Sequence, residues 1–108
     1  MVRGRADIEV EELEWDDENI EHLAKHGVTQ AAAESVLAIA PRFFENLHGR
    51  GGSHVMVGPD RDGRYLYVSL IESEIYIGVW HPVTGWPLGR RGPRLYNSGG
   101  EASAETQT

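Results

Sequence analysis

The chain has 108 residues, of which 40% are hydrophobic and 25% charged, with a formal net charge of −7 and no cysteine. The missing cysteine excludes disulfide scaffolds and thiolate metal sites, and no apolar run approaches the roughly 20 residues that a membrane-spanning helix needs. We therefore expect one soluble, cytoplasmic domain formed by residues 1–97, followed by a disordered polar tail at residues 98–108.

The negative charge is concentrated in the first half of the chain. Residues 1–47 carry 11 acidic and 4 basic side chains, whereas residues 48–96 carry 4 acidic side chains and 6 arginines. Because nucleic acids are bound chiefly through Lys and Arg, the net charge of the whole chain argues against such a partner. The local excess of arginine in the second half leaves RNA binding open.

The N-terminal part is predicted to begin with a strand and a short helix. Residues 8–15 alternate between apolar and acidic side chains, which is typical of a strand with its acids in solvent. Asp16 or Asp17 can accept a hydrogen bond from a free backbone N–H and so cap a helix over about residues 17–26. Gly27 follows and favours the left-handed conformation in which helices end.

A second helix is predicted over about residues 30–40, between a capping Thr29 and a terminating Pro41. After it the apolar pattern changes to a period of two, which predicts strands joined by short connections and hence an antiparallel meander. The predicted strands are Arg42–Leu47, Ser53–Gly58, Arg64–Ile71 and Glu74–His81. Glycine and proline dominate the segment after His81, so only a short helix at Arg94–Asn97 is expected there.

Two histidines, His22 and His26, are four residues apart and therefore lie on the same side of the first predicted helix. Zinc motifs use this spacing, but a zinc protease needs Glu directly after the first histidine, where this chain has Leu23. Glu18 is the nearest further candidate ligand. We predict no metal site and no cofactor, interpret His22 as a solvent-facing residue and leave the role of His26 open; a metal-dependent hydrolase is the least favoured alternative.

The second half of the chain holds side chains suited to cleaving RNA without a metal. They are Arg64 at a strand start, His81 at a strand end, and Arg90, Arg91, Arg94 and Tyr96 near the C-terminus. In such a reaction a base removes the 2′-OH proton, an acid protonates the leaving 5′-oxygen, and guanidinium groups neutralise charge on the phosphorane. Histidine serves either proton-transfer role because it titrates near neutrality.

A structural interpretation of the same residues stays open. With a period of two, His81 would share a face with Ile75, Ile77 and Val79, so it would cap an apolar row at the sheet edge. Arginines in a loop are also common on surfaces that only face solvent. These patterns alone do not decide between a catalytic and a structural role.

The segment Glu14–Val28, EWDDENIEHLAKHGV, closely resembles the BrnT family of bacterial type II toxins. Members of that family have an E/F-W-D opening, an asparagine-containing first helix and a K-H-G-V-[ST] junction, which Thr29 completes here. The resemblance covers about residues 13–97. Further similar segments are Gly63–Val68, more faintly Ile77–Thr84, and Arg94–Tyr96.

The resemblance implies a RelE-like α+β fold with an N-terminal strand, two helices, an antiparallel meander and a short C-terminal helix. It also implies a ribonuclease that cleaves mRNA and arrests translation until a cognate BrnA-like antitoxin neutralises it. DNA would be contacted only through the antitoxin. The assembly would be a homodimer of this chain or a heterotetramer of this chain with the antitoxin. The candidate catalytic residues are His81, His26, Arg64, Arg94 and Tyr96, and the candidate RNA-binding residues are Arg61, Arg90 and Arg91.

This chain differs from the family pattern at arginine positions. His81 stands where the family usually has Arg, and Ser53 or His54 stands where an Arg often starts the middle strand. One lost donor to a developing charge costs on the order of 3 kcal/mol of transition-state stabilisation. The alternative hypothesis is therefore a catalytically weakened or inactive family member that acts as a binding module in a toxin–antitoxin or regulatory complex.

Overall fold

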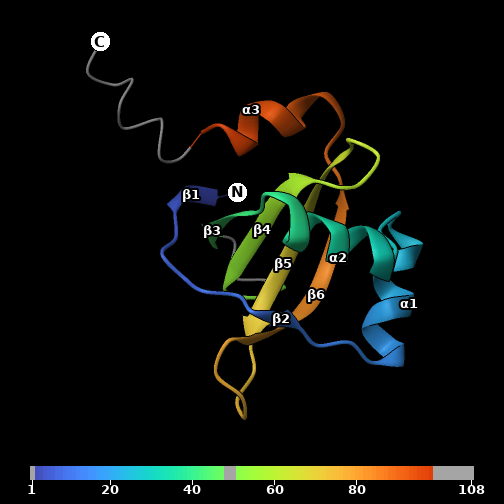
Figure 1. Ribbon diagram of the computed structural model, residues 1–108, viewed down its shortest axis with the longest axis vertical. Coiled ribbons are helices and arrows are strands. Elements are labelled where there is room, and N and C mark those ends of the chain that lie inside the picture. The colour runs from blue at the N-terminus through green and yellow to red at the C-terminus, as the bar shows by residue number, and fades with distance from the viewer. Residues whose placement is uncertain (1, 48–50, 99–108) are drawn as a thin grey trace.

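The computed structural model describes residues 2–47 and 51–98, with side chains from Arg5 onward, so nearly all of the predicted polar tail lies outside the described residues. The described chain folds into a six-stranded mixed sheet with helices packed against it (Figure 1). Its elements are β1 (Val2–Arg5), β2 (Glu12–Leu13), α1 (Asp17–Lys25), α2 (Gln30–Ile39), β3 (Arg42–Asn46), β4 (His54–Pro59), β5 (Tyr65–Glu72), β6 (Val79–Pro87), a 3₁₀ turn (Gly89–Arg91) and α3 (Gly92–Tyr96).

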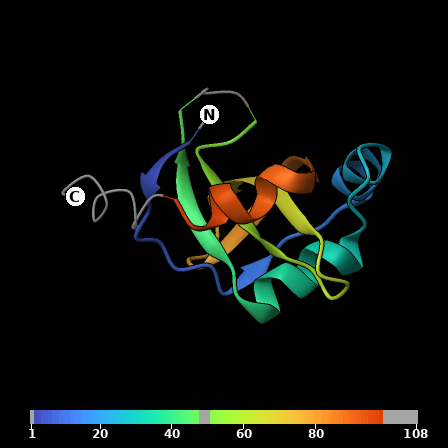
Figure 2. The ribbon, with the colours of Figure 1, turned by 90° about the horizontal axis from the view of Figure 1, so that it is seen from above.

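The strand order across the sheet is β1-β3-β4-β5-β6-β2. Strands β3 to β6 form the antiparallel meander that the sequence predicts, and β2 adds to β6 in parallel. Figure 2 shows α2 and α3 on opposite faces of the sheet, with α1 at its side. The predicted α+β class is confirmed. Within the described residues, no helix is long and apolar enough to cross a membrane.

Both predicted helices are confirmed, together with the residues that begin and end them. The Asp16 carboxylate accepts from the backbone N–H of Asn19 at 2.8 Å, and the Asn19 side chain accepts from the backbone N–H of Asp16 at 2.8 Å. This reciprocal pair satisfies donors that a helix N-terminus otherwise leaves free. Thr29 caps α2 in the same way, through the N–H of Ala32, and Gly27 follows α1 with φ +93°.

The predicted strand at residues 8–15 is wrong except at Glu12–Leu13. This segment crosses the end of the sheet instead of joining it along its length, and it is held there because the Gly78 carbonyl accepts from the N–H groups of Glu11 and Glu12. Its alternation arises because the apolar side chains pack against the core while the acids face solvent. Strand β1, which pairs with β3, was not predicted because its sequence, VRGR, has no apolar alternation.

The last predicted strand, Glu74–His81, is also wrong except at Val79–His81, because β6 runs from Val79 to Pro87. The preceding residues form a turn in which Ser73 N–H donates to the Val79 carbonyl at 2.9 Å. Ile75 and Ile77 are 77% and 92% exposed, so they do not form an apolar row with His81. Pro82 is accommodated within β6 because the pairing with β5 shifts register between Ser69 and Leu70, beside it, and Pro87 is the last residue of the strand.

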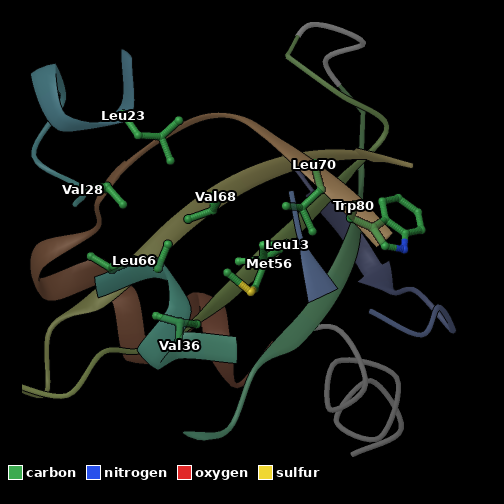
Figure 3. Packing of buried hydrophobic residues seen from close by; sticks show 10 residues of the cluster. Leu13, Leu23, Val28, Val36, Met56, Leu66, Val68, Leu70 and Trp80 are labelled. Carbon is green, nitrogen blue, oxygen red and sulfur yellow. The ribbon is translucent and has the colours of Figure 1, made fainter. Parts of the chain in front are cut away.

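Two hydrophobic clusters hold the layers together. The larger one, shown in Figure 3, lies between the sheet and the helices α1 and α2. Its buried members are Leu13, Leu23, Val28, Ala33, Val36, Met56, Leu66, Val68, Leu70 and Trp80. On the opposite face Phe44, Val55, Val57 and Tyr67 are covered by side chains of the C-terminal segment, among them Leu95 and Tyr96. The C-terminal segment is therefore part of the packed domain.

Candidate functional site

Three histidines lie where α1 packs beside β6. Strand β2 pairs only with Val79 and Trp80, so the rest of this β6 edge is left for α1 (Figure 1). His22 belongs to α1, His26 is the residue at its C-terminal end, and His81 comes from β6. We call this line of contact, from His81 at one end of β6 to Pro87 at the other, the α1–β6 seam.

Asn19 fixes the position of α1 along the seam. Its side chain is 4% exposed, and its amide nitrogen donates to the carbonyls of Glu14 at 3.1 Å and Pro82 at 3.0 Å. The same side chain completes the cap of α1 through the backbone of Asp16. One buried amide therefore connects the start of the helix to the strand, which sets where the histidines of α1 lie along β6.

His81 stands among carboxylates at the first end of the seam. Its Nδ1 is 3.5 Å from a Glu14 oxygen and its Nε2 is 4.0 Å from an Asp16 oxygen. Its Nε2 is also 3.4 Å from the Asn19 amide nitrogen. His81 borders a pocket of about 330 Å³, whose lining is Asp16, Glu18, Asn19, His22, His81, Pro82 and Val83. Within the described residues, no group of three or more His, Asp or Glu side chains is placed to hold a metal ion.

The pair His22 and His26 occupies the middle of the seam. Their ring centroids are 4.9 Å apart in an edge-on arrangement, and His22 Nε2 lies 3.2 Å from the Thr84 hydroxyl. Both histidines are exposed. The sequence predicts a solvent-facing His22, and its spacing to His26 is the signal for the pair. The contact with Thr84 has no sequence signal, because the predicted strand ends at His81.

An aromatic stack follows, formed by the exposed Trp86 of β6 and the buried Tyr67 of β5. Trp86 lies two residues after Thr84, so both side chains leave the same face of β6. The Trp86 ring stacks on Tyr67 at 4.5 Å between centroids with an interplanar angle of 14°, and Trp86 is still 42% exposed. Burial raises the pKa of the Tyr67 hydroxyl above its ordinary value, so this ring stays neutral at physiological pH. Of the two rings, Trp86 is therefore the one that solvent reaches, since Tyr67 is buried.

The seam ends at a pocket that contains arginines. Gly27, at the end of α1, packs against the Pro87 ring, which a Cβ on the glycine would approach to 3.3 Å. Pro87 in turn borders a pocket of about 550 Å³. The lining of that pocket is Gly63, Arg64, Tyr65, Pro87, Gly89, Arg90 and Pro93. Arg64 and Arg90 therefore lie beyond the His26 end of the seam.

Arg64 is anchored to the turn between β4 and β5. Its Nε donates to Asp60 at 3.1 Å, and the backbone N–H groups of Asp62 and Arg64 donate to the other Asp60 oxygen. Burial would raise the pKa of Asp60, but these hydrogen bonds outweigh it and hold the pKa below its ordinary value. The Arg64 side chain is still 47% exposed, so its other guanidinium donors face solvent.

The structure does not bring the predicted catalytic residues to one place. His81 pairs with Ile71 of β5, whereas Arg64 precedes the other end of that strand; at about 3.3 Å per residue, they are roughly 20 Å apart along the sheet. Tyr96 belongs to packing on the α3 face: its hydroxyl donates to the Ala40 carbonyl at 2.7 Å. The remaining candidates Arg61, Arg91 and Arg94 are exposed outside the seam.

Comparison with family models, with curated proteins and with solved structures finds no match to this chain. What the protein does is therefore inferred from the chemistry of the seam and from the residues that the sequence motifs single out.

Proposed function

We propose that the protein is a BrnT-like endoribonuclease with a RelE-like fold, that it acts without a metal, and that the α1–β6 seam is its RNA site. The observation that carries this proposal is the exposed pair His22 and His26, 4.9 Å apart, beside the Trp86–Tyr67 stack. The groups along this line suit metal-free cleavage of a single-stranded RNA. Two imidazoles can transfer protons, an aromatic ring can stack on a base, and arginines can contact the phosphates.

The proposed reaction uses the histidine pair for both proton transfers. One imidazole takes the proton of the ribose 2′-OH, whose oxygen attacks the adjacent phosphorus, while the other protonates the 5′-oxygen as its bond to phosphorus breaks. The products are a 2′,3′-cyclic phosphate and a 5′-OH. Thr84 holds one ring nitrogen of His22, which fixes the ring orientation that proton transfer needs.

Binding of the substrate is assigned to the second half of the seam. A base stacks on Trp86, and such stacking is sequence-tolerant because every base has an aromatic face. Arg64 and Arg90 then contact the phosphate backbone beyond His26. The sequence predicts His81 as a catalytic proton-transfer residue, but Glu14 and Asp16 beside it repel the phosphate on which it would act. We assign His81 instead to holding α1 against β6.

A second candidate function is a catalytically inactive binding module. The observation that favours it is the charge distribution: carboxylates surround His81, and the arginines lie at the far end of the seam instead of around the histidines. Such a module would act only by forming a complex, for example with a BrnA-like antitoxin that contacts DNA. It would bind that partner without harming the cell when expressed alone.

Induced expression in bacteria separates the two proposals. The wild-type chain should stop growth and deplete mRNA, and co-expression of the neighbouring open reading frame should restore both. His26→Ala should abolish the arrest, whereas Lys25→Ala, an exposed residue of the same helix, should not. Normal growth with intact RNA, from folded wild-type protein, would exclude the ribonuclease and leave the binding module.

A further inference from the structure

An ordered apolar tip projects from the sheet between β5 and β6. Its residues Ile75, Tyr76 and Ile77 are 77%, 61% and 92% exposed, and Figure 1 shows the loop extending beyond the strands that it joins. It lies at the end of β5 opposite to Arg64, so it is separate from the arginine end of the seam. Apolar side chains gathered in this way are a common mark of an interaction surface.

The apolar tip is held in shape by its own hydrogen bonds. The Ser73 hydroxyl accepts from the backbone N–H groups of Ile75 and Tyr76, both at 3.1 Å. Gly78 closes the turn with φ +85°, and its carbonyl accepts from Glu11 N–H at 2.8 Å. Since the loop is ordered before any contact, a partner that binds it loses little free energy to ordering the loop.

A pocket with an acidic rim lies at the base of the apolar tip. Its volume is about 300 Å³, at the lower end of the range for ligand pockets and therefore suited to one large side chain. The apolar lining residues are Ile8, Ile77 and Trp80, the carboxylates are Glu9, Glu11 and Glu72, and His54 and Gly78 complete the lining. Among the side chains that the structure describes, none of these three carboxylates forms an ion pair.

We propose that this surface docks an extended, basic segment of another protein. One large apolar side chain of that segment enters the pocket, its Lys or Arg neighbours pair with Glu9, Glu11 and Glu72, and the apolar tip covers the segment from one side. The pairing of charges decides the kind of partner: the rim repels nucleic acid and anionic lipid, and two copies of this chain would bring carboxylates face to face. The proposal does not depend on the ribonuclease activity.

Peptide titration of the full chain tests this docking. The probe is a short synthetic peptide with one tryptophan between arginines, and the readout is the amide chemical shifts of the ¹⁵N-labelled protein. Two matched peptides have glutamate in place of the arginines or serine in place of the tryptophan. We expect shifts confined to residues 8–12, His54 and residues 72–80 with the first peptide only, and binding that weakens as salt is raised.

Variants locate the contact on the protein. Ile77→Ser should weaken binding of the tryptophan peptide by about tenfold through lost apolar burial, and Glu11→Gln by about two- to fivefold. Ile77 is 92% exposed, so the first variant keeps its fold, which circular dichroism checks. The matched control is Ile39→Ser on α2, where the isoleucine is 52% exposed and binding should not change.

Four results would overturn the proposal. The first is shifts outside the residues that line the site, or no shifts at all. The second is equal binding of the serine or the glutamate peptide. The third is a dimer in sedimentation experiments that Ile77→Ser dissociates, and the fourth is binding of phosphatidylserine vesicles that competes with the peptide. The third would identify a second copy as the occupant and the fourth a lipid surface. Loss of ribonuclease activity in the seam variants leaves this test unaffected.

Discussion

Asn19→Ala should weaken the whole domain, because this one buried amide joins α1 to β6. The substitution removes the acceptor for Asp16 N–H at 2.8 Å and the donors to the Glu14 and Pro82 carbonyls at 3.1 and 3.0 Å. At about 1 kcal/mol net for each hydrogen bond, the free energy of unfolding falls by about 3 kcal/mol. For a domain of this size that corresponds to a melting temperature lower by about 12–24 °C.

The same variant should also lose RNA cleavage below its melting temperature. Without Asn19 the helix is no longer held at Pro82, so His22 moves relative to Thr84, its partner at 3.2 Å. Thermal unfolding by circular dichroism measures the first effect and cleavage of a labelled RNA the second. Glu21→Ala, at an exposed position of the same helix, is the control and should melt like the wild type. A melting temperature for Asn19→Ala within about 2 °C of the wild type would refute this role.

The remaining predictions concern the β4–β5 turn, α3 and the aromatic stack. The pKa of Asp60 is held below its ordinary value, so its carboxylate stabilises the fold above the unfolded pKa of about 4. This stabilisation is lost as the pH falls through the lower pKa of the folded state. Urea unfolding at several pH values should show this acid-dependent decrease in the free energy of unfolding for the wild type and not for Asp60→Asn. Gly92→Ala would place a Cβ 2.2 Å from Tyr65 Cβ. It should therefore displace α3 and lower the free energy of unfolding by about 1–3 kcal/mol. A urea midpoint equal to that of the wild type would contradict this. Trp86→Ala should weaken binding of a single-stranded RNA about 5- to 150-fold, measured by fluorescence anisotropy, and unchanged affinity would remove the stack from the RNA site.

Much of the fold follows from local signals in the sequence. The caps Asp16 and Thr29 and the glycine at position 27 place both helices, since these residues satisfy or end the helix backbone by themselves. The hairpin after β4 is similarly local, because Asp60 organises it through neighbouring N–H groups. Such interactions depend on residues a few positions apart, which a single sequence displays.

The errors arise where distant residues decide the structure. Ile75 and Ile77 have the apolar alternation of a strand, but they lie in the connection between β5 and β6, because β5 pairs with the later segment that ends at Pro87. The same shift explains the missed part of the site: Thr84 and Trp86 become functional candidates only once β6 is known to pass beside α1. The separation of His81 from Arg64 likewise depends on strand register, which the sequence pattern leaves open.

The most direct test of the central claim is cleavage of a labelled single-stranded RNA by the purified full chain in the presence of EDTA. We expect products with 2′,3′-cyclic phosphate ends, and we expect His22→Ala and His26→Ala each to slow cleavage by about 100- to 10,000-fold, while Lys25→Ala cleaves at the wild-type rate. No cleavage by folded wild-type protein, or wild-type rates from both histidine variants, would contradict the assignment of the α1–β6 seam as a ribonuclease site.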